Sequence, residues 1–80
     1  MSFTVYVLQD DAGKFYKGMT NNLDRRLKEH KSGHTQTTKK MKDLVVVYTE
    51  KYDSFDKARY RELYLKTAAG RRFLKQTLGG

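Results

Sequence analysis

The sequence predicts a single α+β domain, residues 1–80, in which a small three-stranded antiparallel sheet is flanked by helices in the order β-β-α-β-α-α. Short apolar runs with alternating side chains mark the strands, and helical spacing with capping residues marks the helices. A chain of 80 residues can bury one modest core, and 38% hydrophobic with 32% charged residues is typical of a folded domain.

The first two strands are predicted over residues 3–8 and 14–18, joined by a turn at Asp10-Asp11-Ala12-Gly13. Alternation places Val5 and Val7 on one face of the first strand and Tyr6 on the other. Because both faces are apolar, we expect the first strand to lie in the centre of the sheet or to be well covered on both sides.

The middle of the chain predicts one helix, a loop and the third strand. Asn21 or Asn22 can cap a helix over residues 23–31. Residues 32–42 are rich in Gly, Ser, Thr, Gln and Lys and predict a polar loop. Residues 44–52 are the third strand.

The last third of the chain is expected to be helical. Asp53 or Ser54 can cap a helix over residues 55–68. Gly70 is expected to interrupt this helix before a short final one over residues 71–77.

Charge points to a polyanionic partner. Seventeen Lys and Arg against nine Asp and Glu give a net charge of +8, spread over both halves of the chain. Such a surface attracts nucleic acid. The absence of Cys excludes disulfides and Cys-rich zinc sites, and the longest apolar run, residues 44–48, is too short to cross a bilayer. A cytoplasmic location, with no membrane partner, is therefore expected.

The first helix carries two candidate site residues, Arg26 and His30, which flank its apolar stripe together. Arg25 lies four residues before Glu29, and an ion pair between them would hold Arg25 outside a site. The alternatives are an arginine that lays its aliphatic stem over the core and a buried, hydrogen-bonded imidazole.

The second helix carries a carboxylate, Glu62, on its apolar face, which is formed by Phe55, Ala58, Leu65 and Ala69. A buried carboxylate needs a cation, because burial of an unpaired ion costs several kcal/mol. The cation is a metal ion, Arg59 or Lys66. On the hairpin, Tyr6 and Tyr16 could share a face, although strand tyrosines are more often part of a core.

These segments together resemble the GIY-YIG nuclease superfamily, in particular small stand-alone members similar to the N-terminal catalytic domain of the DNA repair excinuclease. The resemblance covers nearly the whole chain. The matching segments are Val5-Tyr6-Val7, Phe15-Tyr16-Lys17-Gly18-Met19-Thr20, Asn22-Leu23-Asp24-Arg25-Arg26-Leu27-Lys28-Glu29-His30, residues 44–50 and residues 58–66.

The resemblance implies a metal-dependent endonuclease that hydrolyses phosphodiester bonds in nucleic acid, with DNA as the expected substrate and little sequence specificity. It makes Tyr6, Tyr16, Arg26 and His30 catalytic residues, and Glu62 the ligand of one Mg²⁺ or Mn²⁺. Arg26 would hold the scissile phosphate and Tyr16 would relay a proton from the attacking water, oriented by Tyr6 and His30. Gly18 would let the chain pass close to the phosphate.

Further basic residues are expected to contact the nucleic-acid backbone, and a partner protein could supply specificity because no recognition helix is present. They are Lys17, Lys39, Lys40, Arg71 and Arg72, with Lys42 and Lys75 as further candidates.

The sequence departs from the motifs at three places. Thr4-Val5 stands where the family name has Gly-Ile, Lys17 replaces a hydrophobic residue, and an Asn expected near the C-terminal end has no clear match, Gln76 being a doubtful substitute. The main alternative is therefore a non-catalytic nucleic-acid-binding module of the same fold. A third interpretation is a protein-interaction domain whose charge serves only solubility.

Overall fold

A computed structural model describes residues 2–32 and 42–79 of the chain. The predicted order β-β-α-β-α-α is confirmed. The elements are β1 (Phe3–Gln9), β2 (Phe15–Thr20), α1 (Leu23–Lys31), β3 (Val45–Tyr52), α2 (Phe55–Leu65) and α3 (Ala68–Thr77). Most of the predicted loop over residues 32–42, with Lys39 and Lys40, lies outside the described residues.

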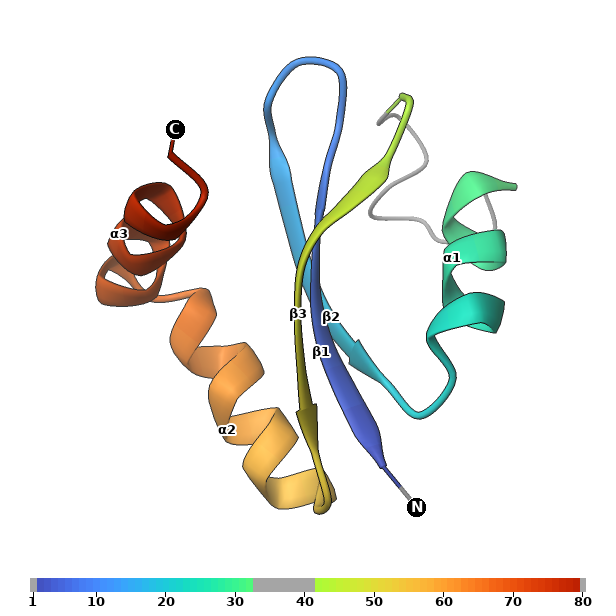
Figure 1. Cartoon of the computed structure of the whole chain (residues 1–80), viewed down its shortest axis with the longest axis vertical. Helices are drawn as coiled ribbons and strands as arrows, with labels where there is room; N and C mark the ends of the chain where they lie inside the picture. The colour runs from blue at the N-terminus through green and yellow to red at the C-terminus, as the bar shows by residue number, and fades with distance from the viewer. Residues whose placement is uncertain (1, 33–41, 80) are drawn as a thin grey trace.

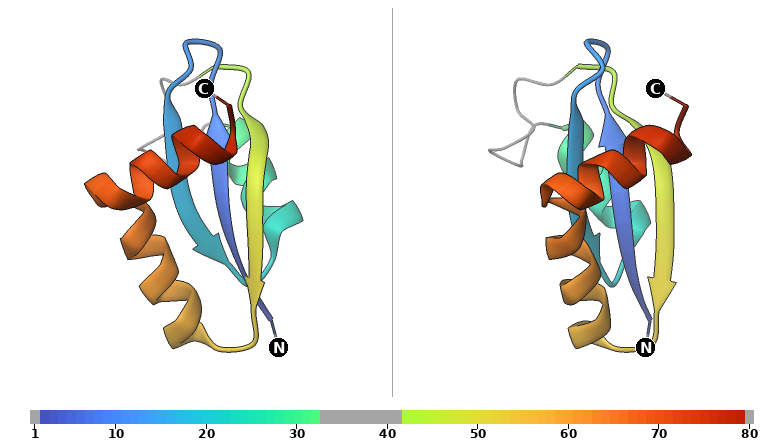
Figure 2. Two further views of the ribbon diagram at one scale, coloured as in Figure 1. Left: turned by 60° about the vertical axis from the view of Figure 1, so that its left-hand side comes forward. Right: turned by 90° about the vertical axis from the view of Figure 1, so that its left-hand side faces the viewer.

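The strands form one antiparallel sheet in the order β2-β1-β3, so the first strand lies in the centre as predicted. Figure 1 shows α1 against one face of the sheet and α2 with α3 against the other. In both views of Figure 2, α2 and α3 lie in front of the sheet and α1 lies behind it. Residues on both faces of β2 are thus brought close to a helix.

Each face of β1 contributes to its own core, which explains why the strand is apolar throughout. Val5 and Val7 pack with residues of α2 and α3, namely Ala58, Leu65 and Leu74. Tyr6 and Leu8 pack on the opposite face with Leu44, Tyr16, Leu23 and Leu27. Residues 5–8 are all fully buried.

Capping decides where the first two helices begin. The side chain of Asn22 accepts a hydrogen bond from the backbone N–H of Arg25, and that of Ser54 accepts one from Lys57. The caps are therefore Asn22 and Ser54, which directly precede the first helical turns, and not Asn21 and Asp53.

The predicted interruption of the C-terminal helices at Gly70 is wrong. The second helix ends at Leu65, and the side chain of Thr67 caps a third helix that begins at Ala68, so Gly70 lies within the first turn of α3. A Cβ on Gly70 would lie 2.1 Å from the carbonyl oxygen of Tyr64. The glycine is needed for close packing of two helices and does not end one.

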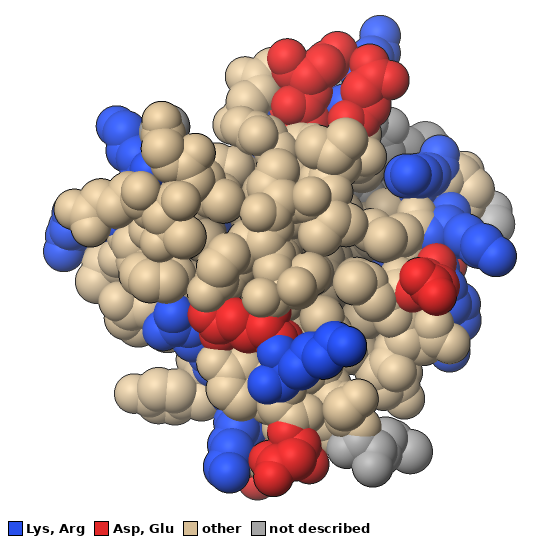
Figure 3. Space-filling view, in the orientation of Figure 1, with Lys and Arg blue, Asp and Glu red and all other residues tan. Residues whose placement is uncertain are grey.

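None of the helices in the described part of the chain is long and apolar enough to cross a membrane. Figure 3 shows the face of the molecule that carries β3. Its middle is mostly neutral, and many of the Lys and Arg side chains stand along its margins. The basic character of the surface is therefore not centred on the β3 edge.

Candidate active site

A glycine on β2 allows two tyrosines to lie beside each other. Gly18 is paired with Tyr6, and Tyr16 with Leu8, so Tyr6, Tyr16 and Gly18 share one face of the sheet. A Cβ on Gly18 would lie 2.7 Å from the hydroxyl oxygen of Tyr6 and 3.2 Å from the ring of Tyr16. Gly18 is therefore the residue that makes room for both rings.

His30, near the end of α1, completes an aromatic cluster with these tyrosines. Its ring centroid lies 4.9 Å from that of Tyr16 and 5.8 Å from that of Tyr6, and the two tyrosine centroids are 6.3 Å apart. The hydroxyl oxygen of Tyr6 lies 2.9 Å from Nε2 of His30. Three of the predicted site residues, from three different elements, are thus brought together.

Burial keeps two members of the cluster uncharged at neutral pH. It raises the pKa of Tyr6 to about 12, so the phenol retains its proton. Burial, with the nearby positive charge of Arg26, lowers the pKa of His30 below its ordinary value. Tyr6 is fully buried and His30 is 2% exposed, whereas Tyr16 is half-buried, so among these rings only Tyr16 is open to a substrate.

Arg26 lies beside the cluster on α1, one turn before His30. Hydrogen bonds to Tyr6, Glu29 and Tyr16 raise the pKa of its guanidinium, which stays charged. Its Nη1 lies 3.0 Å from Oε1 of Glu29, with about a third of each side chain exposed. The predicted pairing of Glu29 with Arg25 is wrong, because residues three apart also share a helical face and the bond formed is the one to Arg26.

Glu62 is buried on α2 as predicted, and both of its oxygens are engaged by bases. Oε1 lies 2.7 Å from Nη1 of Arg59, and Oε2 lies 3.2 Å from Nζ of Lys66. Glu62 lies on α2, which covers the opposite face of the sheet from α1, and its negative charge is the smallest of the causes that raise the pKa of Tyr6. Of its expected neighbours on the face of α2, Phe55 is 55% exposed and Ala69 belongs to α3 and is exposed.

Basic residues meet on the α2 and α3 side of β2. Lys17 is partly buried there, and its pKa is lowered by burial and by the positive charges of Arg71 and Lys66. Arg71 and Arg72 are both exposed on α3. The structure thus brings Lys17 and Arg71, two of the predicted backbone contacts, into one positively charged region.

The sequence reasoning missed a polar network that fastens α2 to β3. Glu50 accepts hydrogen bonds from Nε and Nη2 of Arg61, at 2.9 and 3.1 Å, and from the hydroxyls of Tyr48 and Tyr52. The guanidinium of Arg61 also stacks 4.8 Å from the ring of Phe73. The period of two in Tyr48, Glu50 and Tyr52 places them on one strand face and was the signal available in the sequence.

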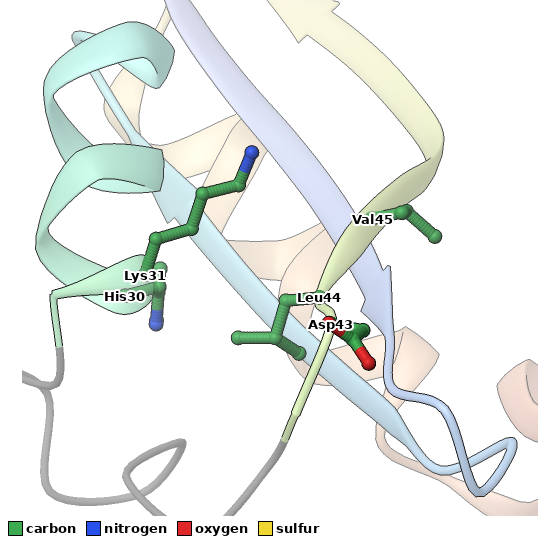
Figure 4. A pocket seen from close by; sticks show the side chains of 5 residues that line it. All are labelled: His30, Lys31, Asp43, Leu44 and Val45. Carbon is green, nitrogen blue, oxygen red and sulfur yellow. The ribbon is translucent and has the colours of Figure 1, made fainter.

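Two hollows open on the described surface. One, of about 350 Å³, adjoins Arg26 and is lined by Phe3, Met19, Thr20, Asn21, Arg25, Arg26 and Phe55. The other, of about 450 Å³, lies between the end of α1 and the start of β3 and is lined by His30, Lys31, Asp43, Leu44 and Val45 (Figure 4). Each hollow therefore has one predicted site residue in its lining, Arg26 in the first and His30 in the second.

Comparison with known proteins agrees with this geometry. The model of the GIY-YIG catalytic domain matches residues 2–75. A UPF0213 protein of Staphylococcus haemolyticus is 32% identical over 72 residues, 89% of this chain and 88% of that protein. A UPF0213 protein of Natronomonas pharaonis is 36% identical over 64 residues, 79% of this chain and 75% of that protein.

A solved structure shares the fold as well. The solution structure of a UPF0213 protein from Bacillus halodurans aligns with a TM-score of 0.62 and 30% sequence identity, covering 100% of this chain and 88% of that one. The family match spans nearly all of the residues that form the sheet, the three helices and the aromatic cluster. The chain therefore belongs to the GIY-YIG family, whose shared domain is a nuclease domain that acts on nucleic acid.

Proposed function

We propose that this chain is a divalent-metal-dependent endonuclease that hydrolyses phosphodiester bonds in nucleic acid, with DNA as the expected substrate. The observation that carries the proposal is the aromatic cluster: the ring of Tyr16 lies 4.9 Å from that of His30, and Nε2 of His30 lies 2.9 Å from the hydroxyl oxygen of Tyr6. Arg26, one turn before His30 on α1, interacts with both tyrosines and supplies a permanent cation near the half-buried Tyr16. A phosphodiester needs such a cation, and a proton relay, where charge grows during hydrolysis.

Each residue of the cluster has a distinct part in the proposed reaction. Arg26 binds a non-bridging oxygen of the scissile phosphate. Tyr16 releases its own hydroxyl proton to solvent as its oxygen takes a proton from the attacking water, so the phenol is neutral before and after the step. Tyr6 and His30 are buried behind them and are positioning residues, because their hydrogen bond and ring contacts fix where Tyr16 and Arg26 point.

Glu62 is the residue proposed to hold Mg²⁺ or Mn²⁺. No three His, Cys, Asp or Glu side chains form a cluster within residues 2–32 and 42–79, so a cation there would rest on one protein carboxylate, with water and phosphate completing its ligands. Each carboxylate oxygen has two lone pairs, and the side chains of Arg59 and Lys66 are about half exposed, so a hard cation could bind Glu62 beside one of these bases or in its place. When bound, the cation supplies charge stabilisation for the phosphate and the leaving oxygen.

The proposal is tested with supercoiled plasmid and Mg²⁺ or Mn²⁺. We expect nicking by the wild-type protein, and losses of about 100-fold or more in Arg26→Ala and Glu62→Gln, the range for removal of one charge-stabilising group. Lys28→Ala and Asp56→Asn remove one charge of the same sign from an exposed position of the same helix and should leave the rate unchanged. Nicking that survives both site substitutions would show that another protein in the preparation is responsible.

A non-catalytic nucleic-acid-binding module is the second candidate, and one observation favours it. Both oxygens of Glu62 are already neutralised by Arg59 and Lys66, as in a carboxylate that serves only an ion-pair network. This candidate predicts binding to DNA that weakens steeply with salt, without nicking at any Mg²⁺ or Mn²⁺ concentration. The same plasmid assay therefore separates the two functions.

A further inference from the structure

A hollow lined by two phenylalanines also has Arg26, the arginine of the proposed active site, in its lining. Its volume is about 350 Å³, and it has Arg25 and Arg26 in its lining. The starts of β1 and α2 and the connection from β2 to α1 lie at the same end of the molecule (Figure 1), and these segments contribute lining residues of the hollow. Arg26 is thus common to the hollow and to the proposed active site.

The apolar part of the hollow is built around an exposed phenylalanine. Phe55, the first residue of α2, is 55% exposed, and its ring meets that of Phe3 edge-on, with centroids 5.8 Å apart and an interplanar angle of 83°. An edge-on contact uses only the rim of one ring, so much of the surface of Phe55 is left open. A flat aromatic group could stack there.

The polar part of the hollow matches a nucleotide. Arg25 is exposed and carries a positive charge next to that of Arg26, so a phosphate backbone is favoured along this side. Asn21 is also exposed, and its amide offers both donors and an acceptor to the edge of a base. An aromatic platform, two guanidiniums and an amide together suit an unpaired nucleotide better than they suit an apolar ligand.

We infer that this hollow binds an unpaired nucleobase, stacked on Phe55, next to the phosphodiester bond held by Arg26. The inference rests on the proposed function and refines it, since it names the substrate class as single-stranded, branched or otherwise unpaired nucleic acid. A base inside a regular duplex is already stacked on its neighbours and would have to be flipped out before it could occupy the hollow.

The experiment measures binding and not cleavage, so its result does not depend on turnover. Dissociation constants of a fluorescent single-stranded oligonucleotide and of its duplex are measured in EDTA at fixed salt. Phe55→Ala and Phe55→Leu remove the stacking ring, and Phe55→Leu keeps an apolar contact with Phe3. Phe55→Trp retains a platform, and Tyr60→Ala removes another exposed ring of α2 as the matched control.

We expect Phe55→Ala and Phe55→Leu to weaken single-strand binding by about 5- to 100-fold, the value of one base stacked on an aromatic residue. Phe55→Trp should bind within about twofold of wild type, with quenched indole fluorescence, and duplex affinity should change little in every variant. Unchanged single-strand affinity in both Phe55→Ala and Phe55→Leu, or an equal loss on duplex, would overturn the inference. Failure of the nicking assay alone would overturn the proposed function and leave this binding result in place.

Discussion

Replacement of Gly18 by alanine should damage both stability and the proposed activity. The new Cβ would lie 2.7 Å from the hydroxyl oxygen and 2.8 Å from Cζ of Tyr6, and real Cβ atoms do not approach other atoms that closely. Because Tyr6 is fully buried, its ring cannot swing into solvent and must push on its neighbours. Overpacking of this kind costs about 1–3 kcal/mol, and disturbance of the bond to His30 costs about 1 more.

Alanine also restricts the unfolded chain and returns about 0.4–1 kcal/mol, so the expected net loss in the free energy of unfolding is about 1–3 kcal/mol. With a urea dependence of about 1 kcal/mol per molar for a domain of this size, the midpoint should fall by about 1–3 M. Displacement of Tyr6 and Tyr16 should reduce nicking about 100-fold.

A matched control separates lost stability from lost alignment. Gly13 has a positive φ of 85° in the hairpin turn, and a Cβ there meets only the side chain of Gln9, at 3.8 Å. Gly13→Ala should therefore lose about 1 kcal/mol through backbone strain and nick at the wild-type rate. If Gly18→Ala unfolded at the wild-type urea concentration, or nicked as fast as Gly13→Ala, the description of the tyrosine cluster would be incorrect.

Three further predictions concern stability. Glu50→Gln should lower the free energy of unfolding by about 2–3 kcal/mol in urea titrations at pH 7, because it weakens charged hydrogen bonds from Arg61. Burial raises the pKa of Glu50, but the hydrogen bonds from Arg61, Tyr48 and Tyr52 outweigh burial and hold that pKa below 4.5. The stabilisation from Glu50 is therefore present above pH 4.5 and is lost as the pH falls through the folded-state pKa. Equal acid sensitivity of wild type and Glu50→Gln would contradict this. Burial and the positive charge of Arg26 hold the pKa of His30 below 6.5 in the folded protein. As the pH falls below 6.5 the unfolded chain takes up a proton at His30 before the folded protein does, so the folded protein loses stability. Wild type should therefore lose more stability than His30→Gln between about pH 7.5 and 5.5, and an identical loss would be the contrary result. Leu74→Ala leaves a cavity at a fully buried position where α3 packs on the sheet. It should lower the free energy of unfolding by about 2–5 kcal/mol, measured by thermal or urea unfolding. A loss below about 1 kcal/mol would show that α3 is not held there.

The sequence was sufficient for the elements because its local signals agreed with one another. The apolar residues on both faces of β1 predicted a strand that is central or well covered, and Asn21 or Asn22 and Asp53 or Ser54 marked the helix starts, of which Asn22 and Ser54 are the caps. Gly70 was wrongly predicted to end a helix, because the contact that requires a glycine there cannot be seen in the sequence. Its lack of a side chain serves a contact with the carbonyl of Tyr64, which exists only after α3 folds back on α2.

The structure brings several of the candidate residues together, but not always with the partners expected for them. The period of two indicated that Tyr6 and Tyr16 could share a sheet face, and the register of β1 with β2 places both of them there together with Gly18. Helical spacing could not decide between Arg25 and Arg26 as the partner of Glu29, because residues three and four apart are both neighbours on a helix. Nor could spacing show that Arg59 and Lys66 would both engage Glu62, since this depends on side-chain rotamers.

The proposed proton relay is tested most directly by the nicking rates of two single-atom variants. Tyr16→Phe removes the hydroxyl beside Arg26, and Tyr60→Phe removes a hydroxyl from a tyrosine of α2 that is 78% exposed. Measured side by side on supercoiled plasmid with Mn²⁺, Tyr16→Phe should nick at least about 100-fold more slowly than wild type, and Tyr60→Phe at the wild-type rate. Equal rates for the two variants would contradict the assignment of Tyr16 and with it the mechanism.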